Sequence, residues 1–311
     1  MAYGYTENPH NMEEINSFVI TDVQKIISLI ISTKTCYFYD TCSFRRHANL
    51  DSENVEYLLK YIKLQKGMIV ITRCILMELA SSTGTLNQEY VQYIERIKNF
   101  GISVVVLYEE DLFSVMEVCF STNAMINSYL CWAVRTMKLP VSTITKALEE
   151  DSGLYHEVIK GKNLESGAIY RHFFKAVRSK KEADDNLGEE LLAICLHILS
   201  YIPGEEDGKF CVMTDDKEAG GKISRLFQQT ARHYQGSRVT VLSTPKLVQI
   251  MHREHILEEK ERIREILDTG VSGNLVILGA RIFDIRIREI SLSSEKLADL
   301  IVQPNGIQII F

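Results

Sequence analysis

The chain has 311 residues, of which 46% are hydrophobic and 24% are charged, and its formal net charge is −6. These values are ordinary for a globular protein with a sizeable core, and the negative charge argues against a protein that coats nucleic acid nonspecifically. No apolar run reaches the roughly 20 residues that cross a bilayer, so we expect no contact with a membrane. The seven cysteines are scattered and never form a C-x-x-C pair, which favours reduced core thiols and a cytoplasmic location.

Short apolar segments that alternate with amphipathic helices predict an α/β fold, with a parallel sheet covered by helices on both faces. Residues 1–35 are expected to form an N-terminal helical extension. If the expected strands are numbered along the chain, we predict the order 3-2-1-4-5 and a helical insertion at about 110–182. The five strands are expected at residues 35–39, 68–72, 102–107, 210–214 and 238–242.

The pattern changes near residue 246, where a small α+β appendage of about 65 residues is expected. It begins with a charged helix at 253–267, continues with one or two strands within 273–290, and ends with a short helix and a last strand. The chain therefore divides into an extension (1–35), an α/β domain (36–245) and an appendage (246–311).

Five acidic residues are expected at the carboxyl edge of the sheet, where open α/β sheets bind ligands. Asp40 ends the first strand, and Asp215 and Asp216 follow the fourth. Glu78 lies in the helix after the second strand, and Glu189 opens the helix before the fourth. Such carboxylates repel one another unless a cation neutralises them, and Mg²⁺ and Mn²⁺ favour oxygen ligands. Because one or two such ions can activate water against a phosphodiester, these residues indicate a metal-dependent nuclease.

The segments around these residues resemble, in order, the four acidic motifs of PIN-domain proteins. They are Tyr39-Asp40-Thr41-Cys42-Ser43, the stretch 71–79 that ends in Met77-Glu78-Leu79, Gly188-Glu189, and Thr214-Asp215-Asp216. The third resembles the variant in which a glycine and a glutamate open the helix. The resemblance spans roughly residues 36–243. It implies a Rossmann-like PIN domain, bound Mg²⁺ or Mn²⁺, and endonucleolytic hydrolysis of RNA that leaves a 5′-phosphate.

The resemblance also implies roles for individual residues. Asp40, Glu78, Glu189 and Asp215 would be catalytic metal ligands, and Asp216 would be a further catalytic ligand or an orienting residue. The hydroxyl groups that would contact metal-bound waters or phosphate oxygens belong to Thr41, Ser43 and Thr214. Compact PIN toxins have shorter chains than this one, which weakens the expectation of a toxin role with a small antitoxin partner.

A basic run over residues 171–181 is the best candidate for RNA contact. It joins Arg171, Lys175 and Arg178 to two phenylalanines, and cations beside aromatic rings are typical of proteins that grip single strands. The alternative is an amphipathic helix whose phenylalanines pack inward and whose cations are solvated. A protein partner or a second copy of the chain would use the C-terminal appendage.

Structural readings stay open for several of these residues. Asp40 could cap the following turn, Glu78 could be solvated, and Asn186 with Glu189 could form a capping box. If Asp215 is a metal ligand, Asp215→Asn should leave the metal-free protein at least as stable as the parent. The functional alternative is a PIN-like scaffold that binds RNA or protein without cutting. A receiver-like or phosphatase-like protein is disfavoured, because Cys42 stands where a second aspartate is usual.

Overall fold

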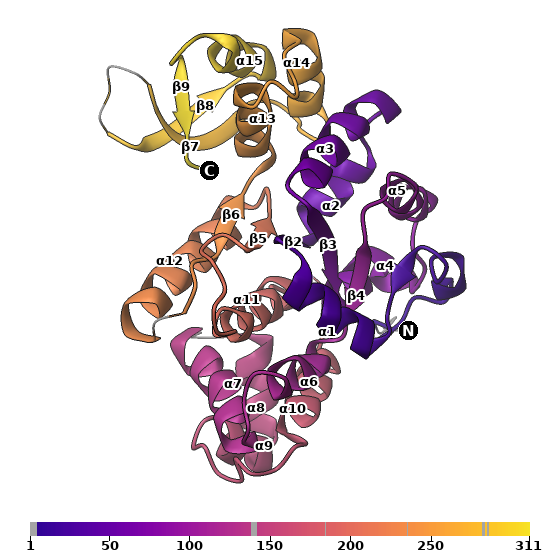
Figure 1. Cartoon of the computed structure of the whole chain (residues 1–311), viewed down its shortest axis with the longest axis vertical. Helices are drawn as coiled ribbons and strands as arrows, with labels where there is room; N and C mark the ends of the chain where they lie inside the picture. The colour runs from indigo at the N-terminus through magenta and orange to yellow at the C-terminus, as the bar shows by residue number, and fades with distance from the viewer. Residues whose placement is uncertain (1–4, 138–141, 184, 235, 282–283, 285) are drawn as a thin grey trace.

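The computed structural model describes residues 5–137, 142–183, 185–234, 236–281, 284 and 286–311. Six strands form a central parallel sheet in the order β1-β4-β3-β2-β5-β6 (Figure 1). The α/β class is thereby confirmed, and the sheet is compatible with a Rossmann-like fold. The strands are β1 (Val19–Ile20), β2 (Thr35–Tyr39), β3 (Gly67–Thr72), β4 (Val104–Leu107), β5 (Phe210–Met213) and β6 (Thr240–Leu242).

The N-terminal extension contributes a strand as well as a helix. β1 pairs in parallel with β4, so that Val19 lies opposite Val104. The side chain of Asp22 then caps helix α1 (Val23–Ser32) by accepting a hydrogen bond from the backbone N–H of Lys25. Because the helix begins only after this cap, the two preceding β-branched residues are free to extend along the sheet edge. The expected helix is therefore present, but the expectation of a helical extension missed strand β1.

Side chains of the central strands alternate between two hydrophobic cores, one on each face of the sheet. In β2, Tyr37 and Tyr39 belong to the first core, and Cys36 and Phe38 belong to the second. Strands that are apolar on both faces must be covered on both faces by helices. The first core includes residues of α2 (Thr41–Ala48), α3 (Ser52–Leu64), α4 (Arg73–Ala80) and α5 (Gln88–Asn99). The second includes residues of α1, α11 (Leu187–Leu199) and α12 (Lys217–Tyr234).

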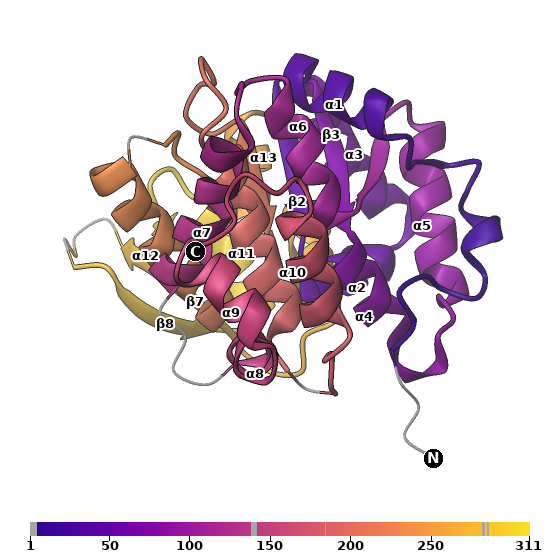
Figure 2. The same ribbon diagram turned by 90° about the horizontal axis from the view of Figure 1, so that it is seen from below.

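The segment between β4 and α11 is helical, and it packs on the second core. Figure 2 shows these helices in front of the sheet, and in Figure 1 they occupy the lower end of the molecule. No helix in the described ranges is long and apolar enough to span a membrane. The segment contains η3 (Glu109–Asp111), α6 (Leu112–Glu117), α7 (Asn123–Met137), α8 (Thr143–Glu150), α9 (Ser152–Val158) and α10 (Ile169–Arg178).

The C-terminal appendage holds a second, antiparallel sheet in the order β8-β7-β9, at the end of the molecule opposite α6–α10 (Figure 1). Its apolar side chains join the first core. The expected helix at 253–267 is present only in part, because the chain turns at His255, whose φ is +57°, buries Leu257, and is helical again from Lys260. The elements are α13 (Thr244–Arg253), α14 (Lys260–Asp268), β7 (Leu275–Arg281), β8 (Arg288–Leu292), α15 (Ser294–Val302) and β9 (Ile307–Ile309).

Candidate functional site

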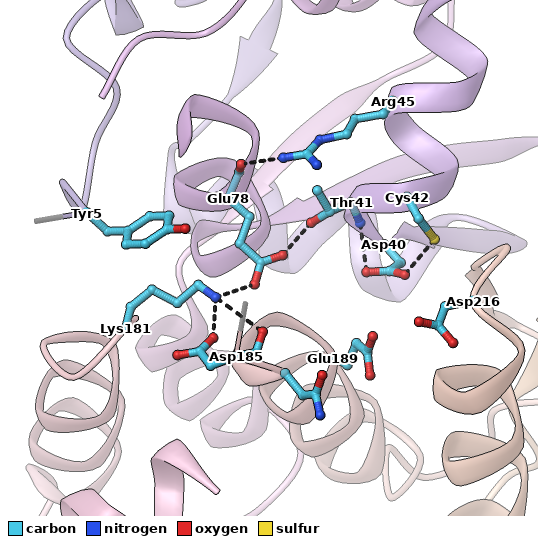
Figure 3. Close-up of a pocket in the computed structure, with 11 residues that line it drawn as sticks. Tyr5, Asp40, Thr41, Cys42, Arg45, Glu78, Lys181, Asp185, Glu189 and Asp216 are labelled. Carbon is cyan, nitrogen blue, oxygen red and sulfur yellow. Dashed lines mark hydrogen bonds and ion pairs between the residues drawn. The ribbon is translucent and has the colours of Figure 1, made fainter. Parts of the chain in front are cut away.

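A pocket of about 430 Å³ opens where β2 ends, between α4 and α11 (Figure 3). Four of the five expected carboxylates line it, namely Asp40, Glu78, Glu189 and Asp216. The pocket is also lined by Lys181, the last residue of the basic run, and by Thr41 and Asn186. Its remaining lining residues had no expected site role, namely Tyr5, Cys42, Arg45 and Asp185.

Asp40 is both a helix cap and part of the pocket wall. It is 4% exposed, and its Oδ1 accepts a hydrogen bond from the N–H of Thr41 at 2.7 Å. Its Oδ2 accepts hydrogen bonds from Thr214 Oγ1 at 2.8 Å and from Cys42 Sγ at 2.9 Å. Burial raises the pKa of Asp40, although these donors oppose the shift. The capping reading of Asp40 is therefore compatible with a position in the pocket.

Three groups hold the carboxylate of Glu78 in the pocket wall, and a fourth contacts its backbone. Its Oε2 accepts a hydrogen bond from Thr41 Oγ1 at 2.5 Å, and its Oε1 accepts one from the N–H of Gly188 at 3.1 Å. The Nζ of Lys181 lies 3.0 Å from the same Oε1. The guanidinium of Arg45 donates to the backbone carbonyl of Glu78 at 2.9 Å. Glu78 is therefore not the freely solvated helix residue that the sequence left open.

The carboxylate of Glu78 lies so close to the start of α11 that position 188 has room only for a glycine. A Cβ atom at this position would lie 2.5 Å from Oε1 of Glu78, closer than Cβ contacts in folded proteins. The missing side chain lets the carboxylate of Glu78 approach the first turn of α11 and accept a hydrogen bond there. The Gly-Glu pair thus brings α4 and α11 together at the pocket.

Lys181 follows α10, and its side chain is only 3% exposed. Its ammonium lies between the carboxylates of Glu78 and Asp185, and the ring of Tyr5 lies 5.2 Å away (Figure 3). Burial alone would lower the pKa of Lys181, but the two carboxylates raise it above its usual range. The pocket therefore contains a firmly protonated lysine.

Glu189 is half-buried in the first turn of α11, and it has no hydrogen-bond or ion-pair partner among the described residues. Burial raises its pKa to about 8, and the negative charges of Asp40 and Asp216 add to the shift. The side chain of Asn186 makes no capping hydrogen bond, so the capping box is not formed. Glu189 thus faces an excess of negative charge.

Asp215 and Asp216 are adjacent, but only Asp216 lines the pocket. Its Oδ1 accepts hydrogen bonds from the backbone N–H groups of Glu218 and Ala219, at 2.7 and 3.1 Å, at the start of α12. The carboxylate of Asp215 instead contacts Arg46 at 3.3 Å and the N–H of Thr244 at 2.7 Å. Burial would raise the pKa of Asp215, but the charge of Arg46 and the Thr244 donors hold it below its usual range. The expected metal ligand is therefore already bound by protein groups.

The three expected hydroxyl groups differ in access to the pocket. Thr41 lines it. Ser43 and Thr214 are buried, and they donate hydrogen bonds to Asp215 at 3.1 Å and to Asp40 at 2.8 Å, respectively. Since both hydroxyls are used inside the protein, the structure does not bring them to a substrate.

Residues 171–178 of the basic run lie in α10 and do not line the acidic pocket, whereas Lys181, at the end of the run, does. Phe173 and Phe174 are fully buried, as the amphipathic alternative requires. Arg178 is buried as well, and its Nη1 lies 2.7 Å from carboxylate oxygens of both Glu109 and Glu110. A role for Arg178 in RNA binding is therefore wrong, because η3 places two carboxylates against it.

The other two residues expected to contact RNA, Arg171 and Lys175, are exposed and do not line the acidic pocket. Arg171 lines a separate pocket of about 310 Å³ together with Glu110 and Asp111. Lys175 is exposed on α10 and does not line the acidic pocket. Neither residue therefore forms part of the candidate site.

A metal ion would have to use the carboxylates that remain open. As the side chains stand, no group of three or more His, Cys, Asp or Glu in the described residues is arranged to hold an ion. The chemistry of the donors nevertheless fits a hard divalent cation, because Asp40, Glu189 and Asp216 all offer carboxylate oxygens. Burial is the main cause of the raised pKa of Glu189, and the negative charges of Asp40 and Asp216, which such a cation would neutralise, add to it.

Comparison with known proteins adds no family assignment to this geometry. No family model matches the sequence, and searches of curated proteins and of solved structures found no match.

Proposed function

We propose that this chain is a PIN-like endoribonuclease that hydrolyses RNA phosphodiester bonds with Mg²⁺ or Mn²⁺. The observation that carries the proposal is the position of Glu189, which has no ion-pair partner among the described residues and faces Asp40 and Asp216 in a pocket at the sheet's carboxyl edge. Open parallel sheets bind their ligands at this edge. The order β4-β3-β2-β5-β6 and the four acidic motifs support the PIN-like assignment.

In this proposal, Asp40, Glu189 and Asp216 would hold the metal. The bound ion would supply an activated water and neutralise charge that develops on the phosphodiester. Thr41 and Cys42 orient the carboxylate of Asp40 through their hydrogen bonds. A pKa of about 8 lets Glu189 hold a proton near neutral pH, so proton release would accompany metal binding.

A scaffold that binds RNA or a protein without cutting is the second candidate. This candidate is favoured by the hydrogen bonds and ion pairs that protein groups already make with some carboxylates of the pocket. Both oxygens of Asp40 accept hydrogen bonds, and Glu78 has an ion pair with Lys181. Carboxylates that are neutralised by protein groups need no metal for stability.

Cleavage of a labelled single-stranded RNA by the purified full chain, with and without Mn²⁺, separates the two candidates. The nuclease should produce 5′-phosphate ends only with metal. Glu189→Gln and Asp216→Asn should lower the rate by more than about 100-fold, since even groups that only support metal ligands contribute about 10–100-fold. Glu149→Gln, at an exposed position of α8, is the control. The RNA-binding scaffold would be favoured if RNA bound but was not cut and Mn²⁺ did not change the melting temperature. If neither RNA nor Mn²⁺ bound, the nuclease and the RNA-binding scaffold would both be overturned, and a scaffold that binds protein alone would remain.

We also propose a cytoplasmic location and a protein contact through the appendage. The first is supported by the seven cysteines, which are all free thiols. The second is supported by large apolar side chains of the appendage that are exposed, namely Val276, Ile287 and Ile310. A second copy of the chain or another protein would cover them.

A further inference from the structure

The charges of the pocket fall into two groups. On one side, Lys181 lies between Glu78 and Asp185 and forms ion pairs with both (Figure 3). On the other side, Glu189 and Asp216 have no ion-pair partner within the described residues. A buried lysine therefore forms ion pairs in one half of the pocket, whereas in the other half Glu189 is influenced by the charge of exposed Lys222 without an ion pair among the described residues.

In the half of the pocket that contains Lys181, the charged side chains are held by several contacts. The side chain of Lys181 is 3% exposed, so its ammonium cannot exchange these carboxylates for water without moving. Asp185 is fixed in turn, because its Oδ2 accepts hydrogen bonds from Thr143 Oγ1 at 3.0 Å and from the N–H of Glu182 at 2.8 Å. Buried charges of this kind keep their geometry only when such partners surround them.

Lys181 also acts on the other half of the pocket through Glu78. The Oε1 of Glu78 faces Lys181, and its Oε2 accepts the hydrogen bond from the hydroxyl of Thr41. The backbone N–H of Thr41 donates to Asp40. Three short contacts thus connect the ammonium to the carboxylate of Asp40, which makes Lys181 a positioning residue.

We propose that Lys181 is a built-in cation that neutralises Glu78 and Asp185 in place of a second divalent ion. The pocket then holds a single exchangeable Mg²⁺ or Mn²⁺, on the side of Asp40, Glu189 and Asp216. In two-metal sites the ions lie only about 3.5–4 Å apart and share carboxylates. An ammonium 3.0 Å from Glu78 excludes a second ion from that carboxylate. This inference rests on the proposed metal-dependent function.

Counting bound Mn²⁺ on the purified full chain, by calorimetry and by the electron paramagnetic resonance signal of free Mn²⁺, tests the inference without an activity assay. The parent should bind one ion. Lys181→Met should bind two, because Glu78 and Asp185 become free to hold the second. Lys181→Arg keeps the charge and should bind one. Lys180→Met, at the exposed neighbouring lysine that pairs with Glu150, is the matched control and should bind one.

A double variant identifies where the second ion goes. Lys181→Met combined with Asp185→Asn should return to one ion, since one of the released carboxylates is gone. If Lys181→Met does not fold without metal, recovery of its melting transition by Mn²⁺ supports the proposal, and failure to recover overturns it.

The remaining outcomes separate this inference from the proposed function. Two ions in the parent, or one ion in folded Lys181→Met, would overturn the built-in cation and leave a metal-dependent enzyme intact. No Mn²⁺ on the parent or on any variant would instead overturn the metal-dependent function, and the inference with it.

Discussion

Arg46 on α2 forms an ion pair with Asp215, and neither residue lines the candidate pocket. Its Nη1 lies 3.3 Å from Oδ1 of Asp215, and its Nη2 donates to the backbone carbonyl of Leu267 at 2.7 Å. Leu267 belongs to the last turn of α14, where carbonyl groups attract cations. One buried guanidinium therefore joins the strand end that carries Asp215 and Asp216 to the C-terminal appendage.

The first prediction concerns the difference between these adjacent aspartates. Asp215→Asn should lower the free energy of unfolding by about 3 kcal/mol, because removing one partner of a buried ion pair leaves the other uncompensated. This reverses the expectation drawn from the sequence. Asp216→Asn should change it by less than about 1 kcal/mol, since asparagine caps helices as well as aspartate does. Urea denaturation without metal measures both, and equal losses would contradict the placement of Asp215.

The second prediction concerns pH and Glu189. Its pKa of about 8 in the folded protein lies above the ordinary value of 4.5, so between these values unfolding releases a proton. A rise in pH through this range therefore destabilises the parent. Glu189→Gln cannot ionise, so near pH 8 it should be more stable than the parent by on the order of 1–2 kcal/mol, since solvent screens a half-exposed group.

At pH 4 Glu189→Gln and the parent should be equally stable, because both then carry a neutral group at this position. Melting temperatures across pH 4–9 provide the measurement, with Glu149→Gln as the exposed control. A constant difference between Glu189→Gln and the parent at every pH would contradict the raised pKa.

The third prediction separates structural from accessible cations on α10. Arg178→Met should lower the free energy of unfolding by about 3–5 kcal/mol, because Glu109 would be buried without its partner. Lys175→Met, on the same helix but exposed, should change it by no more than about 0.5 kcal/mol. Chemical denaturation of both variants tests this, and similar stabilities would reopen a role for Arg178 at the surface.

The fourth prediction concerns the glycine that opens α11. Gly188→Ala should displace the carboxylate of Glu78 from Lys181 and cost about 1–3 kcal/mol, the usual effect of overpacking. Gly221→Ala in α12 is the control, because its Cβ would meet no atom of the described side chains and backbone within 4 Å. It should stabilise the protein by about 0.5–1 kcal/mol, since alanine is the better helix former. Loss of stability in Gly221→Ala but not in Gly188→Ala, measured by thermal unfolding, would contradict this account.

Local sequence patterns were sufficient to predict most strands of the central sheet. Strands β2 to β6 lie within the expected apolar segments or close to them, because buried parallel strands are short, apolar runs between helices. Strand β1 was missed, since a two-residue strand is defined by its pairing with β4 and not by its own composition. The break at His255 was missed for a similar reason, because the burial of Leu257 depends on the tertiary core.

The sequence predicted only those residues of the candidate site whose place follows from their position at the end of a strand or the start of a helix. Placement at strand ends and helix starts identified Asp40, Glu78, Glu189 and Asp216. Which of the two adjacent aspartates faces the pocket depends on Arg46 and Thr244, which no local pattern connects to them.

The basic run shows the same limit. Arg178 looked accessible because its partner Glu109 lies 69 residues earlier in the chain. Lys181 lies in the same run, and the acidic Asp185 four residues later was a signal that it is paired.

The central position of β2 has a consequence for synthesis of the chain on the ribosome. β3 is made soon after β2, but β5, the strand on the other side of β2, begins only roughly 170 residues after β2 ends. At about 5–20 residues per second, the open edge of β2 waits about 9–34 s for its second partner. Unpaired backbone groups on such an edge are a template for pairing with other chains. Slower translation of residues 108–209 should therefore increase aggregation of the nascent protein without any change in its sequence.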